Sequence, residues 1–315
     1  EAIRGWAKTW QALDFLLVIN TRDLSGAPIA VEGAFDEPAP FATKAAVFQH
    51  IVGLLDQART HLQAGGAAFP FSIGGGMAAF DTPATFLQFN RALRARVAVY
   101  LGDYAGAIAL FPQTFLSTSA DLDLGAYHTF ATSEGQGNDL ANAFIYARPA
   151  LFADAETQAG STALDRRVLE KIEAHPSPRS QQGVSSDKRF TLYPDASSDL
   201  PIIRNEELIL LRAEARWFTG DKPGAMADLN FIRTQSGGLA PIAQPATDAE
   251  FITALLKERK YSLMFEGGHR WIDARRFGRL DSLGKDVPTH TIVPRWAIPE
   301  AECLARDLPS PCNVA

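Results

Sequence analysis

Residues 205–278 constrain the fold more than any other part of the chain, because two predicted helical hairpins follow one another there. Apolar residues recur at helical spacing after Asn205, which we expect to cap the first helix. Gly220 supplies a left-handed stop, and Asp221 can cap the next helix with Pro223 in its first turn. The pattern predicts a helix, a short turn and a second helix.

The second hairpin of this stretch opens as clearly as the first. Thr247 and Glu250 have the spacing of a capping box, and an apolar helical pattern follows them. We expect this helix to end at Gly267 and Gly268, since paired glycines commonly terminate helices.

Charged residues interrupt this last helix, and two interpretations are open. Glu258 and Arg259 lie within the apolar pattern, and Glu266 closes it beside several arginines. Such groups can serve catalysis, but neighbouring opposite charges more often form ion pairs that hold helix ends together. We interpret these three residues as helix-to-helix ion-pairing groups.

An internal repeat appears when Gly102–Asp103 is aligned with Gly220–Asp221. The segment RARVAVYLGDYAGAI, which begins at Arg94, then lies over RAEARWFTGDKPGAM, which begins at Arg212. Small residues at matching places allow close helix packing, as in tetratricopeptide-type hairpins. Each hairpin leaves an apolar flank that a neighbour must cover, so such units stack into a superhelix.

The N-terminal part supplies a weaker copy of this unit. Residues 1–65 are predicted to form a helical hairpin, with helices over 1–19 and 43–63 and a long connection between them. Residues 66–110 follow as a glycine- and phenylalanine-rich loop and a repeat helix. The glycines are not followed by GK[ST], which argues against a nucleotide-binding loop.

The segment ERKYSLMFEGGHRWIDARRFG, preceded by IIRNEELILLRAEARWFTGDKPGAMADLNFIRTQSGG, resembles the C-terminal half of the SusD/RagB family. Members of that family are outer-membrane lipoproteins that bind glycans beside a transporter. The resemblance implies a mainly all-α fold, a tetratricopeptide-like helical-hairpin superhelix with long irregular loops and a few short strands. We expect residues 1–315 to form one such domain, with 279–315 as a C-terminal tail.

The resemblance also implies a function. We expect a non-catalytic cell-surface receptor that binds glycan or another nutrient and delivers it to a SusC-like TonB-dependent transporter. A lipid anchor, on a segment that precedes residue 1, would hold the receptor on the cell-surface side of the outer membrane. No cofactor is expected.

The composition and the charge pattern argue against several other classes of protein. The apolar runs fall far short of the roughly 20 residues of a spanning helix. A net charge of −6 without basic clusters argues against nucleic acid as a partner. The six histidines form no H-E-x-x-H pattern, so no metal site is expected.

The two cysteines lie close together near the end of the chain, at Cys303 and Cys312. Polar and proline-containing residues separate them, and no histidine is near enough to complete a zinc site. A local disulfide is therefore favoured over a metal site, and it indicates an oxidising compartment.

Residues 111–204 do not repeat, and long irregular segments of this kind are commonly functional. A pyranose has an apolar face of C–H groups that suits an aromatic ring and a rim of hydroxyls that suits polar side chains. We therefore expect the ligand surface in loops 66–85 and 111–150. The candidate ligand-binding residues there are Phe71, Phe80, Tyr127, His128, Asn142, Tyr146 and Arg148.

Alternatives remain open at these positions and for the whole chain. The phenylalanines can equally be folded down onto the helices, and Tyr127 lies in an alternating pattern typical of a strand edge. A glycoside hydrolase on a helical scaffold needs only two suitably spaced carboxylates. A tetratricopeptide-type adaptor for protein partners would also suit the repeat.

Overall fold

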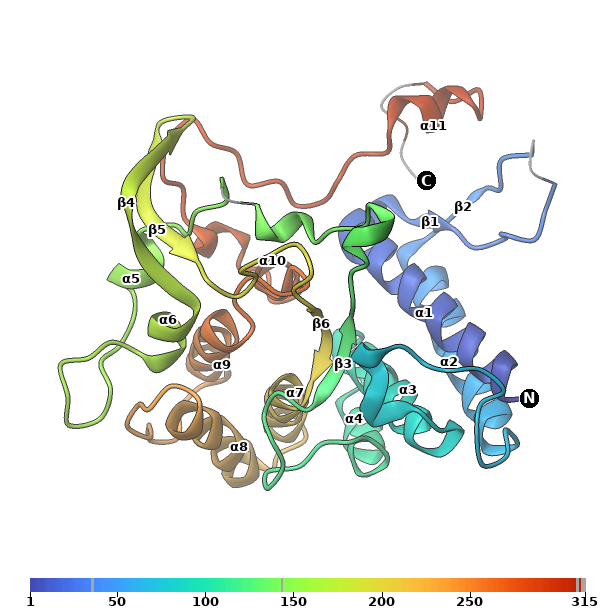
Figure 1. The fold of residues 1–315 in the computed structure, drawn as a ribbon, viewed down its shortest axis with the longest axis horizontal. Helices are drawn as coiled ribbons and strands as arrows, with labels where there is room; N and C mark the ends of the chain where they lie inside the picture. The colour runs from blue at the N-terminus through green and yellow to red at the C-terminus, as the bar shows by residue number, and fades with distance from the viewer. Residues whose placement is uncertain (35–36, 143, 310–311, 313–315) are drawn as a thin grey trace.

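The structure is a computed structural model that describes residues 1–34, 37–142, 144–309 and 312, and it is mainly helical (Figure 1). The longer helices are α1 (Ala2–Arg22), α2 (Lys44–Gln63), α3 (Pro83–Tyr100), α7 (Asn205–Phe218), α8 (Lys222–Gln235) and α9 (Asp248–Ser262). The shorter ones are α4 (Tyr104–Leu110), α5 (Ala150–Ala153), α6 (Arg166–Lys171), α10 (His269–Arg276) and α11 (Glu300–Leu304). The expected fold class is confirmed.

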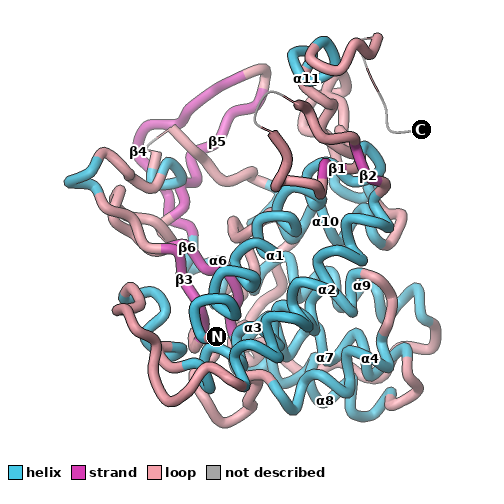
Figure 2. Tube along the Cα trace, turned by 90° about the vertical axis from the view of Figure 1, so that its right-hand side faces the viewer, coloured by secondary structure: helices cyan, strands magenta, loops and turns pink. Residues whose placement is uncertain are grey.

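Among the described residues, the strands form three separate two-stranded pairs. They are β1 (Ala27–Pro28) with β2 (Phe41–Ala42), β3 (Gly125–His128) with β6 (Leu200–Arg204), and β4 (Ile172–Gln181) with β5 (Val184–Phe190), all antiparallel. Turned by 90°, the molecule has most helices on one side and the β3–β6 and β4–β5 pairs on the other (Figure 2). The side that carries β3–β6 and β4–β5 is the strand face of the molecule (Figure 2).

The predicted N-terminal hairpin is present, since α1 packs against α2 along its length. The side chain of Thr43 caps α2 by accepting from the backbone N–H of Ala46. The two helices approach closely at Gly5, where an added Cβ would lie 2.6 Å from Cγ of Leu62. A larger residue at position 5 would push the helices apart.

The internal repeat appears as two hairpins, α3–α4 and α7–α8, with the same turn. The carboxylates of Asp103 and Asp221 accept from the N–H groups of Gly106 and Gly224 at 2.9 and 3.0 Å. A Cβ on either glycine would lie 2.1 Å from that carboxylate, so the cap requires glycine. The two hairpins meet where Tyr104 stacks on Phe218, with ring centroids 4.8 Å apart. The repeat prediction is confirmed.

Two predicted helix ends are wrong. Asn205 is the first residue of α7 rather than its cap, because its buried side chain binds the backbone of Ser117 and Asp121 instead. Helix α9 begins with the expected capping box at Thr247 and Glu250 but ends at Ser262, before the two glycines. Between the end of the helix and the glycines, Phe265 takes a left-handed conformation, with φ of 60°.

The region between the repeats contains the β4–β5 hairpin. The pairing is irregular between Ala174 and Arg179, the stretch that includes Pro176 and Pro178. Proline has no N–H to donate, so it is confined to edges and bulges of this kind.

The end of the chain packs beside the β1–β2 pair. Cys303 and Cys312 form a disulfide with a Cα–Cα distance of 5.6 Å, and both are buried against Phe41. No helix among the described residues is long and apolar enough to cross a membrane. In the same described part of the chain, no group of His, Cys, Asp and Glu residues is arranged to hold a metal ion.

Candidate functional site

A cavity with a volume of about 790 Å³ lies between the strand face and the C-terminal helices. Its walls come from α5, from the start of β6, from the turn between α9 and α10, and from the 3-10 helix η6 (Leu280–Leu283). Most of the lining surface is apolar, and its apolar residues are Leu140, Ala150, Leu151, Phe190, Leu200, Leu263, Met264, Phe265, Trp271 and Leu283.

The α9–α10 turn is an unusual piece of backbone. Phe265, Gly267 and Gly268 have φ of 60°, 49° and 73°, so three positive values occur within four residues. Phe265 is held in this costly conformation because its ring stacks on Phe190, with centroids 4.3 Å apart, and its carbonyl accepts from the Tyr193 hydroxyl. The turn is rigid and presents its residues to the cavity.

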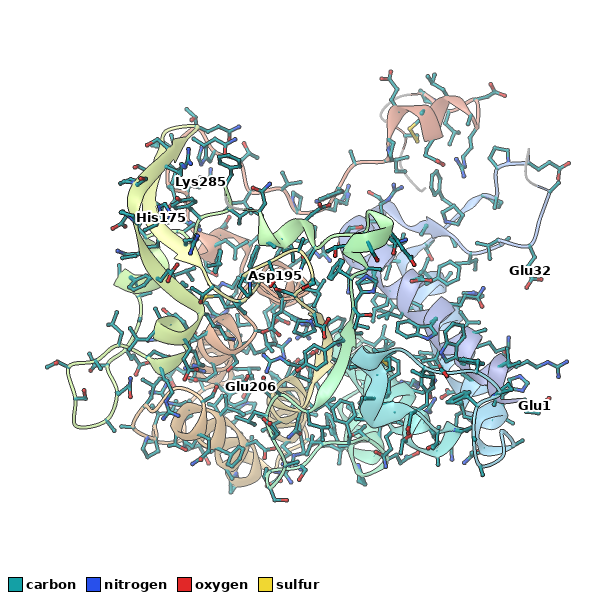
Figure 3. All side chains as sticks on the ribbon, viewed as in Figure 1. Glu1, Glu32, His175, Asp195, Glu206 and Lys285 are labelled. Atoms are coloured by element: carbon teal, nitrogen blue, oxygen red, sulfur yellow. A yellow bond between two sulfur atoms is a disulfide. The ribbon has the colours of Figure 1, made fainter. Side chains whose placement is uncertain are left out.

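Behind this turn, Glu266 is held by a buried arginine. Nη2 and Nε of Arg204 donate to its two oxygens at 2.8 and 3.1 Å. The same guanidinium also pairs with Glu206, which lies among the helices (Figure 3). The pKa of Arg204 is raised because these carboxylates outweigh the burial that would lower it. Glu266, which we expected to close this helix, is thus an ion-pairing group.

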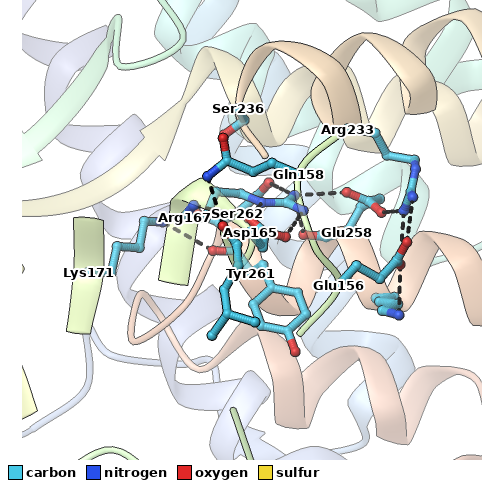
Figure 4. A network of polar contacts seen from close by, with 12 residues as sticks. Glu156, Gln158, Asp165, Arg167, Lys171, Arg233, Ser236, Glu258, Tyr261 and Ser262 are labelled. Carbon is cyan, nitrogen blue, oxygen red and sulfur yellow. Dashed lines mark hydrogen bonds and ion pairs between the residues drawn. The ribbon is translucent and has the colours of Figure 1, made fainter. Parts of the chain in front are cut away.

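A second cluster surrounds Glu258, which is 0% exposed (Figure 4). Nη1 of Arg167 lies 2.8 Å from one carboxylate oxygen, and Nη1 of Arg233 binds the other. Arg233 also binds Glu156, and that hydrogen bond lowers the pKa of Glu156 to about 2. Helices α6, α8 and α9 are joined at this point.

A third cluster lies under α10. Nε of Arg259 donates to Asp273 at 2.6 Å, and Arg276 bridges Asp273 to Glu214 of α7. Burial alone would raise the pKa of Asp273, but Arg259 and Arg276 outweigh it and lower that pKa to about 2. The ion-pair interpretation of Glu258, Arg259 and Glu266 is confirmed.

His269 lies between this third cluster and the cavity. It is 6% exposed, and burial lowers its pKa to about 4, so the imidazole is neutral at pH 7. Nε2 lies 3.6 Å from Glu207, whereas Nδ1 has no hydrogen-bond partner among the described residues.

On the cavity side, two of the lining cations are paired. Nζ of Lys260 donates to Asp154 at 2.8 Å, and Nη2 of Arg148 donates to Asp286 at 2.8 Å. Arg270 is half-buried and lines the same cavity, yet none of the described residues forms an ion pair or hydrogen bond with its side chain. Its positive charge is therefore not paired within the described part of the chain.

An aromatic side chain stands next to this arginine. Trp271 lines the cavity, donates from Nε1 to the carbonyl of Val293 at 2.7 Å, and carries Arg275 over its ring at 4.5 Å. Trp296, from the same C-terminal segment, is 65% exposed. Trp271 therefore gives the cavity wall an aromatic surface beside Arg270.

The predicted residues of the first loop lie away from the cavity. Phe80 is 1% exposed and packs between Phe89 and Phe115, so it belongs to the hydrophobic core and offers no surface to a ligand. Phe71 is 37% exposed and packs edge-on against Trp6 of α1. The alternative interpretation, in which these rings pack onto the helices, is therefore correct for Phe80.

Tyr127 and His128 lie on β3, which pairs with β6. The strand-edge alternative therefore describes Tyr127, whose hydroxyl donates to the carbonyl of Asp123 at 2.5 Å and whose pKa burial raises to about 12. His128 is exposed and lies opposite Leu200, a residue of the cavity wall. The two predicted loops do meet here, since a Cβ on Gly76 would lie 2.3 Å from the Tyr127 carbonyl.

The three remaining candidates lie closer to the cavity. Arg148 lines it directly. Asn142 lines a second cavity of about 310 Å³, which shares Leu140 and Phe190 with the first. The Tyr146 hydroxyl is 3.1 Å from Nδ1 of His175 on β4 (Figure 3).

Sequence reasoning missed the cavity wall formed by residues 260–271. Arg270 and Trp271 were part of a pattern that we assigned to helix packing. The signal that was available is the Gly267–Gly268 pair, which follows a phenylalanine and a glutamate and precedes three bulky side chains. Such a sequence suits a strained turn as well as a simple helix end.

Residues 179–302 match the sequence model of the SusD family. No curated protein matches the chain significantly. Solved structures do match it. A protein from Bacteroides vulgatus, described as a putative outer membrane protein probably involved in nutrient binding, has a TM-score of 0.70 and 11% identity, covering 98% of this chain and 80% of its own.

Two further solved structures give the same result. A SusD-like carbohydrate-binding protein from Bacteroides fragilis has a TM-score of 0.69 at 14% identity, covering 96% of this chain and 78% of its own. A laminarin-binding SusD-like protein has a TM-score of 0.61 at 17% identity, covering 95% and 76%. At these identities the likeness shows the fold. The chain is therefore SusD-like, with the family's sequence pattern in residues 179–302 and a SusD-like fold over nearly its whole length.

Proposed function

We propose that this protein is a non-catalytic receptor that binds an oligosaccharide in the 790 Å³ cavity. The observation that carries the proposal is the cavity itself, which is mostly apolar, carries an aromatic wall and has a few polar groups directed into it. Two solved structures with this fold are described as laminarin-binding and carbohydrate-binding, which supports the assignment.

The lining suits a sugar for a physical reason. The C–H face of a pyranose can lie against Trp271 or the aliphatic residues around it, while its hydroxyls reach Arg148, Asp154 or Lys260. The neighbouring smaller cavity, with Asn142, would extend the site for further sugar units. Tyr146 and His128 would then stand at its rim.

The carboxylates of the cavity support binding rather than hydrolysis. A glycosidase needs an acid whose pKa is raised and a second free carboxylate. The hydrogen bond from Lys260 lowers the pKa of Asp154 instead. Both oxygens of Glu266 are occupied by Arg204.

The further parts of the proposal rest on the family. We propose that the receptor acts on the cell-surface side of the outer membrane, anchored by a lipid on an N-terminal extension, and delivers its ligand to a SusC-like TonB-dependent transporter. The structural neighbour described as a putative outer membrane protein supports the location.

We also propose that residues 1–315 act as one domain. Side chains far apart in sequence support this, because Arg96 of α3 binds Glu207 of α7 at 2.8 Å. Arg275 of α10 donates to the carbonyl of Asn20 in α1 at 2.6 Å. Such contacts tie the N-terminal hairpin to the segment that carries the cavity.

The test uses two variants of helix α5, one that blocks the cavity and one that serves as its control. Ala150 is half-buried and lines the cavity, whereas Ala153 is exposed on the same helix and does not. The parent is first screened by calorimetry against neutral and acidic oligosaccharides. We expect Ala150→Trp to abolish binding of whichever oligosaccharide the parent binds, and Ala153→Trp to leave its affinity unchanged.

Two results would contradict the proposal. Equal affinities for both variants would place the site elsewhere on the molecule. Turnover of the bound oligosaccharide to shorter products would favour the hydrolase.

A further inference from the structure

We propose that the ligand of the large cavity carries a carboxylate, that Arg270 binds this carboxylate, and that the ligand is an acidic saccharide of the uronic-acid type. This inference rests on the proposed function and specifies its ligand class. It follows from the one guanidinium in the cavity wall that the described part of the chain leaves without a partner.

The other charges of the cavity are compensated within the protein. Lys260 is paired with Asp154, and Arg148 with Asp286. Glu266 is bound from behind by Arg204. A neutral ligand would therefore find the charges of the wall satisfied, except at Arg270.

Arg270 carries a cost that a ligand can relieve. It is half-buried among Leu151, Leu263 and other apolar residues of the wall. Burial lowers its pKa, and Asp154 and Asp273 act on it only from beyond hydrogen-bond distance. A partly buried, unpaired charge is unfavourable for folding, so an anion arriving in the cavity gains the full charge-assisted interaction.

The surrounding groups add to the preference for an anion. Arg270 lies in the first turn of α10, so the positive end of this helix faces the cavity. A carboxylate bound at Arg270 would therefore also lie near the positive end of this helix.

The apolar part of the wall decides what kind of anion fits. A small inorganic ion would leave Trp271 and the leucine residues without a contact. A uronic acid combines both features, because its carboxylate projects from the ring edge while one ring face remains apolar. Arg270 and Trp271 are adjacent residues and can serve both parts of one sugar unit.

The probes are a short oligogalacturonate and its fully methyl-esterified form, which share the sugar ring and differ in charge. Calorimetric titration of the parent should show the acid binding about 10- to 100-fold more tightly, the range expected for a hydrogen bond to a charged group. The advantage should shrink at high salt.

The matched variants are Arg270→Gln and, as a control, Arg179→Gln. Arg179 is exposed on β4, where it stacks on Phe144 outside the cavity. We expect Arg270→Gln to remove the preference for the acid while leaving affinity for the ester and thermal stability unchanged or slightly raised. Arg179→Gln should bind both probes as the parent does.

The outcomes separate this inference from the function beneath it. If neutral oligosaccharides bind and are blocked by Ala150→Trp, but the acid has no advantage over its ester, the carboxylate assignment is wrong and the receptor function stands. If neither neutral nor acidic saccharides bind, both fail. Binding of acidic peptides but not of saccharides would show that the ligand is not a sugar, whereas the receptor function would stand.

Discussion

The two sides of the α9–α10 segment use arginine in opposite ways. On the inner side, Arg167, Arg204 and Arg259 are each about 95% buried or more and each touches at least one buried carboxylate. On the cavity side, Arg270 is less buried and touches none among the described residues. Burial alone therefore does not tell what a charged residue does; the presence of a partner does.

The difference follows from the energetics of buried charge. An ion pair in the interior contributes little net stability, but removing one partner leaves the other charge desolvated and unpaired. The inner clusters are therefore fragile to single substitutions, whereas Arg270 can be neutralised without leaving an orphan. Substitutions on the two sides should accordingly differ in size and in sign.

The largest effect is expected at Glu258, because both Arg167 and Arg233 lose their shared partner. Glu258→Ala should lower the free energy of unfolding by about 3 to 5 kcal/mol. Glu173→Ala is the control, since its pair with Arg189 is exposed and should contribute less than about 1 kcal/mol. The free energies of unfolding of both variants are compared by urea unfolding. Similar losses would contradict the expected difference between the buried and the exposed ion pair.

The next effect concerns pH. The pKa of His269 falls from 6.5 to about 4 on folding, so between these values the unfolded chain binds a proton that the folded chain does not. Stability is complete above pH 6.5 and should fall by about 1.4 kcal/mol per pH unit toward pH 4, about 3 kcal/mol in all. His269→Gln should lose this part of the slope. Parallel pH profiles for parent and variant would show that the histidine titrates normally.

A smaller effect of opposite sign is expected at Arg270. Arg270→Gln removes a half-buried charge that has no partner among the described residues, so the free energy of unfolding should stay level or rise by up to about 1 kcal/mol. Arg204→Gln, which removes the buried guanidinium shared by Glu266 and Glu206, should be destabilising under the same conditions. A loss of stability at Arg270 comparable to that at Arg204 would mean that it belongs with the inner clusters.

The smallest effects are expected at the rim. Tyr146→Ala should weaken binding of the oligosaccharide found by the screen by about 2- to 10-fold, the value of one aromatic contact. Tyr127→Ala, at the edge of β3, should leave the affinity unchanged. Ala150→Trp, by contrast, should abolish binding. Unchanged affinity of Tyr146→Ala, with the thermal midpoint of the parent, would remove Tyr146 from the proposed surface.

Local sequence signals were sufficient for much of the fold. The caps at Asp221 and Thr247 form as expected, because a cap depends on residues three positions apart. The same locality explains the agreement of the repeat. Asn205 was misread because its side chain is used by Ser117 and Asp121, a contact that no local pattern contains.

The sequence by itself determined the helical hairpins, their repeat and the ion-pairing character of the α9 charges. Only the tertiary structure decided the cavity, because its wall joins residues 140, 148–154, 190, 200, 260–271 and 282–284. It also decided that Phe80 is core and that Arg270 has no partner in the described chain. Helix patterns depend on neighbours within one or two turns, whereas exposure and pairing depend on which distant segments meet.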